Sequence, residues 1–199
     1  EKPFYAKHNY DVEYVGHPLL DAIEQYNEQP KEPLAIPEGD DRPVIAVLPG
    51  SRVQELKTKL PVMLTLTDRF QQYRFVIAGA PNMERSLYRE LIGNRDVEVV
   101  FGQTYALLQQ SEAAVVTSGT ATLETALFEI PQVVCYIGNP VSYQIAKRLV
   151  NVKYISLVNL ILDKEAVAEL IQNDCTTENL ANELSLIVKG GKKREQVLE

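Results

Sequence analysis

Small hydroxyl residues and a glycine come directly after an apolar run in the second half of the chain. Residues 113–116 are alanines and valines, typical of a buried strand, and Ser118, Gly119 and Thr120 follow at the predicted start of a helix. The free N–H groups at a helix start carry a partial positive charge, and small side chains let a ligand reach them. This pattern predicts a turn that binds an anion such as phosphate.

Glu124 lies about one turn further along the same predicted helix, on the face that also carries Thr120. A carboxylate repels phosphate, so Glu124 is better suited to accept hydrogen bonds from a neutral diol such as ribose. Small residues for a phosphate and an acid for a sugar together predict a nucleotide site. The alternative is a capped helix whose first turns carry an acid that favours the helix dipole.

A second turn of suitable chemistry follows the apolar residues 44–48. Gly50 allows a left-handed turn close to a phosphate, Ser51 offers a hydroxyl and an N–H group, and Arg52 offers a fixed fork of donors. Glu55 is placed to hold Arg52 or to touch an acceptor. The alternative is that the turn only caps the next helix and leaves Arg52 in solvent.

Short apolar runs alternate with helical patterns from residue 44 onward. The predicted strands are 44–48, 75–78, 97–101, 113–117 and 133–137. The predicted helices are 60–73, 84–92, 105–110, 120–128, 142–149, 164–172 and 177–188. This alternation predicts an α/β fold, a doubly wound parallel sheet of the Rossmann-like kind with helices on both faces.

The strand order of such a sheet is 3-2-1-4-5, and ligands bind where the order reverses, between the first and fourth strands. The two turns described above follow those strands, so we expect them to be neighbours. The loop after the third strand reaches the same crevice, where the backbone at Gln103 is placed to read a base edge and Tyr105 to stack. Residues 79–81 lie further from the reversal and are expected to form a plain turn.

The first 43 residues show little periodic pattern and are rich in proline and acidic residues. A strand is expected only at 12–15, and a short helix near 19–26. We therefore expect residues 1–43 to be an interdomain linker that leads into a nucleotide-binding domain at 44–199, which ends in helices.

Composition excludes several classes of function. The net charge of −7 argues against nucleic-acid binding, which needs a basic surface. Cys135 and Cys175 lack the spacing of a metal or redox pair, and no Asp-x-Asp follows a predicted strand. The dinucleotide and P-loop motifs are also absent. We expect no cofactor and no metal, because arginine, N–H groups and hydroxyls can neutralise a diphosphate leaving group.

Segments along the whole chain resemble lipid-A-disaccharide synthase, a bacterial glycosyltransferase family with the GT-B fold. They are residues 3–5, 14–19, 48–52 with Glu55, 118–124, 146–150 (Ala-Lys-Arg-Leu-Val) and 154–160. The run from 146–150 to Asn159 and Leu160 is the most specific to this family. One departure is Val158, where the family usually has proline before the asparagine.

The resemblance implies a hexosyltransferase of lipid A biosynthesis. Such an enzyme transfers 2,3-diacylglucosamine from its UDP donor to 2,3-diacylglucosamine 1-phosphate and releases UDP. The resemblance further implies that this chain is the carboxy-terminal, UDP-binding half, and that an amino-terminal domain supplies the catalytic base and much of the lipid acceptor site. The expected location is cytoplasmic, peripheral to the anionic inner face of the bacterial inner membrane.

The resemblance also assigns roles to residues. Ser51 and Arg52 are expected to meet the diphosphate, with Gly119 and Thr120 on the helix side. Glu124 is expected to hold the ribose.

Other roles implied by the resemblance lie further along the chain. Asn159 matches a position that matters for activity in the family. Lys147 and Arg148 are placed to neutralise a phosphate or lipid head group, or they form a solvated face. A second basic cluster, a candidate for contact with an anionic membrane, comprises Lys189, Lys192, Lys193 and Arg194.

Two other readings stay open. One is another UDP-sugar enzyme of the same fold, either UDP-GlcNAc 2-epimerase-like or peptidoglycan transferase-like. Residues 146–150 and Asn159 favour the synthase, whereas an upstream half with epimerase acids would favour the epimerase. The other is a non-enzymatic nucleotide-binding module, which predicts that this chain is a whole gene product.

Overall fold

The computed structural model describes residues 2–13, 15–30, 32–139 and 153–199. They form two compact units, Glu1–Lys31 and Glu32–Glu199. The first unit contains α1 (Lys2–Lys7) and α2 (Pro18–Asn27). The helix expected near 19–26 is confirmed as α2, which begins at Pro18 and is capped by His17. The strand expected at 12–15 is wrong, because residues 12, 13 and 15 belong to no strand.

The second unit is built on a parallel sheet of six strands. They are β1 (Val44–Leu48), β2 (Arg74–Gly79), β3 (Glu98–Phe101), β4 (Ser111–Thr117), β5 (Gln132–Tyr136) and β6 (Ala168–Ile171). The strand order is β3-β2-β1-β4-β5-β6, with every neighbouring pair parallel. The predicted order of the first five strands is confirmed, and β6 extends the sheet beside β5.

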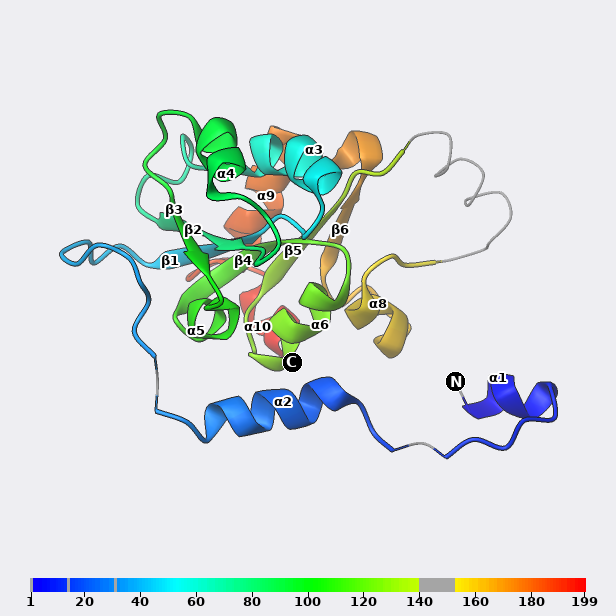
Figure 1. Cartoon of the computed structure of the whole chain (residues 1–199). Helices are drawn as coiled ribbons and strands as arrows, with labels where there is room; N and C mark the ends of the chain where they lie inside the picture. The colour runs from blue at the N-terminus through cyan, green and yellow to red at the C-terminus, as the bar shows by residue number, and fades with distance from the viewer. Residues whose placement is uncertain (1, 14, 31, 140–152) are drawn as a thin grey trace. The chain divides into compact units, whose positions relative to one another are not determined.

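Helices cover both faces of the sheet (Figure 1). One face carries α3 (Val53–Leu64), α4 (Arg85–Ile92) and α9 (Thr177–Ile187). The other carries α5 (Thr104–Gln109), α6 (Thr120–Leu127) and α8 (Leu157–Leu162). Alternate residues of a strand pack on opposite faces, so Ile45 joins the first core and Ala46 the second. The predicted doubly wound α/β class is confirmed.

Some predicted elements differ from the structure. Residues 164–172 do not form a helix, because Ala168–Ile171 pair with β5 as the edge strand β6 and Gln172–Asp174 form the short 3-10 helix η1. Helix α3 begins at Val53 rather than at residue 60, and α8 was not predicted. A final helix, α10, covers Arg194–Leu198. The helix expected at 142–149, with Lys147 and Arg148, lies outside the described residues.

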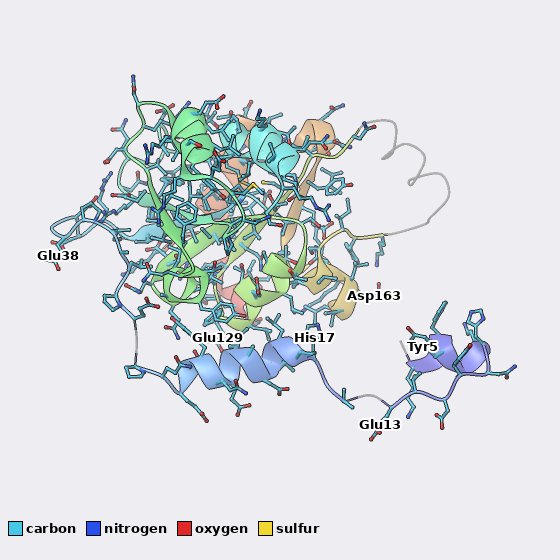
Figure 2. The ribbon with its side chains drawn as sticks, in the orientation of Figure 1. Tyr5, Glu13, His17, Glu38, Glu129 and Asp163 are labelled. Carbon is cyan, nitrogen blue, oxygen red and sulfur yellow. The ribbon has the colours of Figure 1, made fainter. Side chains whose placement is uncertain are left out.

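The segment before β1 is attached to the sheet unit. Leu34 and Ile36 pack against the core of the α5 and α6 face. Gln103 Nε2 donates to the Glu32 carboxylate at 2.8 Å, and the Gln103 Oε1 atom accepts from Ala35 N at 2.9 Å. Glu38 lies at the outer end of this segment (Figure 2). Residues 32–43 therefore fold with the sheet, while the linker role of residues 1–43 stays a prediction.

A search of the described helices finds none that is both long and apolar enough to span a bilayer.

Candidate functional site

A cavity of about 490 Å³ lies at the carboxyl ends of β1, β2 and β4, where the strand order reverses. Both turns that were predicted to bind a ligand contribute to its walls. The first contributes Gly50, Ser51, Arg52 and Glu55, and the second contributes Ser118, Gly119, Thr120 and Glu124. These residues are far apart in the sequence, and the parallel pairing of β1 with β4 brings them together.

The cavity has a third wall that the sequence analysis missed. Gly79, Ala80 and Pro81, which were expected to form a plain turn, line it together with Thr104 of α5. A Cβ atom on Gly79 would lie 2.6 Å from Cε1 of Phe101, so only glycine fits between the strand end and that ring. The sequence feature that could have identified this wall is Gly79, a glycine at the end of a strand next to the point where the strand order reverses.

Thr117 ends β4, is among the residues that line the cavity, and has an unused hydroxyl. The residue is 4% exposed, and its Oγ1 atom has no hydrogen-bond partner among the described residues. A buried polar atom without a partner costs about 1–3 kcal/mol, and such atoms in native proteins are uncommon. A polar group of a bound ligand would satisfy it.

Glu124 is half-buried in the cavity wall, one helical turn into α6. Burial raises the pKa of its carboxyl above the usual value, and a side-chain hydrogen bond with Tyr105 opposes the rise. Burial also raises the pKa of Tyr105, so the phenol stays protonated and donates. The ring of Tyr105 packs against Phe128, with centroids 5.0 Å apart, and is not among the residues that line the cavity.

The first turn uses its own backbone donors to start α3. The Glu55 Oε2 atom accepts from Ser51 N at 3.1 Å and from Arg52 N at 3.3 Å, which is one half of a capping box. Gly50 has φ of +105°, and a Cβ there would lie 2.5 Å from the same carboxylate oxygen. The Arg52 guanidinium and the Ser51 hydroxyl are therefore the groups of this turn that stay available, because both residues are exposed and the two N–H groups are already bound to Glu55.

The second turn keeps its helix start available. Gly119 is the N-cap of α6 and Thr120 its first residue, and the first N–H groups of a helix have no acceptor within the helix. A Cβ on Gly119 would meet no atom within 4 Å, so the space beside the turn is open. Ser118 instead binds protein, because its Oγ donates to the carbonyl of Ile155 at 3.0 Å.

Gln103 does not line the cavity. Its side-chain amide holds residues 32–35 in place through the hydrogen bonds described above, so the side chain is engaged within the protein. The role of its backbone in reading a base stays a prediction.

Asn159 is fully buried in α8, and its side-chain amide is fully used inside the protein. Nδ2 donates to Val167 O and to Glu169 Oε1, each at 2.8 Å. Oδ1 accepts from Ala166 N at 2.8 Å and from Val167 N at 2.9 Å. The residue therefore holds the segment between α8 and β6 and does not line the cavity.

A parallel sheet that is doubly wound and has its cavity at the reversal of strand order defines an α/β domain of the kind that binds ligands at a switch point. Solved structures share this fold. The glycosyltransferase SnogD from Streptomyces nogalater matches with a TM-score of 0.53 and 19% identity, over 95% of this chain and 42% of that one. UDP-GlcNAc 2-epimerase from Neisseria meningitidis, bound to UDP-GlcNAc, matches with a TM-score of 0.52 and 17% identity, over 89% and 44%. These likenesses show the fold alone.

Sequence similarity, unlike the structural likeness, identifies the family. A model of the lipid-A-disaccharide synthetase family matches residues 1–199, and the chain belongs to this family. The lipid-A-disaccharide synthase of Syntrophus aciditrophicus is 35% identical over 206 residues, which cover 100% of this chain and 54% of that protein. The chain spans about half the length of the relatives that it matches. The predicted family is confirmed.

Proposed function

We propose that this chain is the nucleotide-binding half of a lipid-A-disaccharide synthase, a metal-independent glycosyltransferase. The complete enzyme transfers 2,3-diacylglucosamine from UDP to 2,3-diacylglucosamine 1-phosphate and releases UDP. Membership of the family supports the reaction. The observation that carries the nucleotide-binding role is the cavity at the β1–β4 reversal, lined by a cation, a helix start and a half-buried carboxylate.

In this proposal different polar groups of the cavity bind different parts of the nucleotide. Arg52, Ser51 and the N-terminal end of α6 at Gly119 and Thr120 hold the diphosphate, because they supply positive charge and donors. The Glu124 carboxylate accepts hydrogen bonds from the ribose hydroxyls.

The same groups assist the transfer. As the bond between the sugar and the diphosphate breaks, negative charge grows on the UDP leaving group. Arg52 and the N–H groups of α6 are positioned to stabilise that charge from the start, without a reorganisation of solvent. The catalytic base and much of the acceptor site belong, in this proposal, to the amino-terminal half of the enzyme.

Asn159 acts in this proposal as a positioning residue. Its amide is buried and saturated, so it reaches the site only through its neighbours. It holds α8 to β6, and the segment before α8 accepts the hydrogen bond from Ser118 in the cavity wall. Loss of Asn159 would therefore disturb the second turn indirectly.

The proposal includes contact with an anionic membrane surface through the basic residues near the end of the chain. Lys189 and Lys192 are exposed, whereas Lys193 pairs with Glu183 at 3.1 Å and Arg194 donates to two backbone carbonyls. Each exposed lysine near such a surface contributes about 1 kcal/mol. Co-sedimentation with vesicles should rise with their anionic lipid content and fall in Lys189→Gln/Lys192→Gln, and binding that ignores lipid charge would remove this idea.

Isothermal titration calorimetry with UDP, CDP, ADP and GDP tests the nucleotide site. We expect UDP to bind best and Arg52→Ala to weaken it about tenfold, the usual scale of one charge-assisted hydrogen bond. Arg89→Ala, an exposed arginine on α4, is the matched control and should bind as the parent does. A parent chain that shows no preference for UDP, or an Arg52→Ala variant with full affinity, would contradict the proposal.

A further inference from the structure

A second cavity, of about 590 Å³, lies beside the first at the carboxyl ends of β5 and β6. The two cavities share Arg52 and Glu55, which stand between them at the start of α3. The other residues that line the second cavity are Gln54, Thr58, Lys59, Tyr136, Ile137, Gly138, Asn139, Gln172 and Asn173. Most of these side chains are polar. Two of them, Lys59 and Gln172, have nitrogen atoms without a hydrogen-bond acceptor among the described residues.

Lys59 has a largely buried side chain whose ammonium makes one long ion pair, with Glu55. Its side chain is 3% exposed, and the nearest carboxylate oxygen, Glu55 Oε1, lies 3.9 Å from Nζ, which is too far for a hydrogen bond. Across the described residues, Nζ makes no hydrogen bond. Burial lowers the pKa of Lys59, and Glu55 opposes the shift. The side chain is largely buried, and its ammonium has three donors that meet no acceptor within hydrogen-bond distance among the described residues, so an anion in the cavity would stabilise it.

Gln172 supplies a second unused donor in the same cavity. Its Oε1 atom accepts from Gly138 N at 3.2 Å, which orients the amide. Its Nε2 atom is buried and has no acceptor within the part of the chain that the structure describes. The backbone of Gln172 has φ of +52°, a conformation that is rare for residues other than glycine. The Lys59 ammonium and the Gln172 amide nitrogen thus both lack a hydrogen-bond acceptor among the described residues.

The charge balance of the cavity favours an anion. Lys59 and Arg52 are positive and Glu55 is negative, so the three together carry a net positive charge. The Oε2 atom of Glu55 is also engaged with two N–H groups of the first turn, which leaves only Oε1 facing Lys59. The other titratable groups near Lys59 are Tyr136, whose ring centroid is 6.0 Å from Nζ, Cys135 and Cys175.

We propose that the second cavity binds a phosphate group, held by Lys59, Gln172 and Arg52. For one of its two phosphate sources this inference rests on the proposed nucleotide site, and it adds Lys59 and Gln172, which that site does not use. Two sources of phosphate share this chemistry. One is the distal phosphate of a nucleoside diphosphate whose nucleoside lies in the first cavity, and the other is a phosphate monoester on a separate molecule.

The first test uses inorganic phosphate with the whole chain. The ¹³Cε resonance of Lys59, assigned with a Lys59→Met variant, reports its pKa in a pH titration. We expect phosphate to raise that pKa, and calorimetry to show phosphate binding weakened about tenfold or more in Lys59→Met and in Gln172→Leu. Lys57→Met, an exposed lysine on the same helix, is the control.

The second test separates the two sources. If the phosphate is the distal one of a nucleotide, Lys59→Met lowers UDP affinity about tenfold and leaves UMP affinity unchanged. If it is a separate monoester, glucose 1-phosphate binds the UDP-saturated parent and fails to bind Lys59→Met, whose UDP affinity is unchanged. Equal binding of phosphate, UDP and glucose 1-phosphate by the parent and both variants would overturn the inference. Loss of the UDP preference with phosphate binding retained would instead count against the proposed nucleotide site.

Discussion

Thr117 and Glu55 lie in the same cavity and differ in how the protein uses them. Glu55 accepts two backbone hydrogen bonds and caps α3, so it serves the fold. The Thr117 hydroxyl has no partner among the described residues, and in our proposal it binds the ligand. Substitution should affect the two residues differently. Replacing Glu55 removes native hydrogen bonds, whereas replacing Thr117 removes none among the described residues.

Thr117→Val tests the unused hydroxyl. Valine has the same shape and suits a strand, and it removes a buried polar atom without a partner, so we expect the free energy of unfolding to stay equal or rise by about 1 kcal/mol. UDP affinity should fall, because the ligand loses a hydrogen bond. Urea unfolding and calorimetry measure the two effects. A clear loss of stability with full UDP affinity would show that the hydroxyl serves the fold.

Glu124→Gln tests the ribose assignment through its pH dependence. Burial raises the pKa of Glu124, so the carboxylate gains a proton at a higher pH than an ordinary glutamate. UDP affinity should therefore fall as the pH drops through this raised pKa, because the protonated acid is a poorer acceptor. In Glu124→Gln we expect affinity about tenfold lower at neutral pH, and this part of the pH dependence should vanish.

Glu129 provides the matched control for that experiment. It is exposed just beyond the end of α6 and does not line the cavity (Figure 2). Glu129→Gln should keep both the affinity for UDP and its pH dependence. If Glu124→Gln behaves in the same way as this control, Glu124 does not bind the ribose.

At the scale of elements, α8 and β6 are joined by one polar network. The Glu169 carboxylate of β6 accepts from Ile155 N and Ser156 N, each at 2.8 Å, and from Asn159 Nδ2 at 2.8 Å. Ser118 adds a link from the second cavity turn to the Ile155 carbonyl. The edge strand therefore positions a segment that touches the wall of the cavity at the β1–β4 reversal.

Asn159→Ala breaks this network at its most buried point. The change leaves the N–H groups of Ala166 and Val167 and the Val167 carbonyl without their partner. We expect the free energy of unfolding to fall by about 3 kcal/mol, measured by urea unfolding. Asn182→Ala, an exposed position on α9, is the control and should change stability by less than about 0.5 kcal/mol. An equal effect of the two substitutions would contradict the positioning role.

At the scale of the whole molecule, all the residues that line the two cavities belong to the sheet unit. The residues that line them lie between Leu48 and Asn173, and the apolar cores of both sheet faces lie within the same unit. In the first unit, Ile23 is the one buried apolar side chain among the described residues. The sheet unit therefore has its own core and site.

A chain of residues 32–199 tests this independence. Because its core and cavities are complete, we expect it to unfold in one cooperative transition at nearly the same urea concentration as residues 1–199, and to bind UDP with the same affinity. Circular dichroism and calorimetry measure the two properties. Aggregation or a much lower midpoint would show that residues 1–31 stabilise the sheet unit.

Elements that local sequence patterns specify were predicted, and elements that depend on contacts with distant segments were missed. Strands β1 to β5 and their order were predicted because apolar runs, turns and crossover rules act over short stretches of chain. Strand β6 was missed because Ala168–Ile171 lack a run of β-branched residues and were read as part of a helix, and only their pairing with β5 makes them a strand. The start of α3 was placed too late because Glu55 was weighed as a ligand of Arg52 and not as the capping residue that begins the helix.

Residue types and local spacing were enough to predict the fold class, the family and the two turns that line the cavity at the β1–β4 reversal, since each depends on contiguous segments. Only the tertiary structure decided which polar atoms remain free for a ligand. The Asn159 amide and the Glu55 Oε2 atom are engaged in hydrogen bonds within the protein, whereas the Thr117 hydroxyl has no partner among the described residues. Lys59 and Gln172 meet in one cavity although they are far apart in the chain. Hydrogen-bond partners and burial are set by packing between distant segments, which no local pattern records.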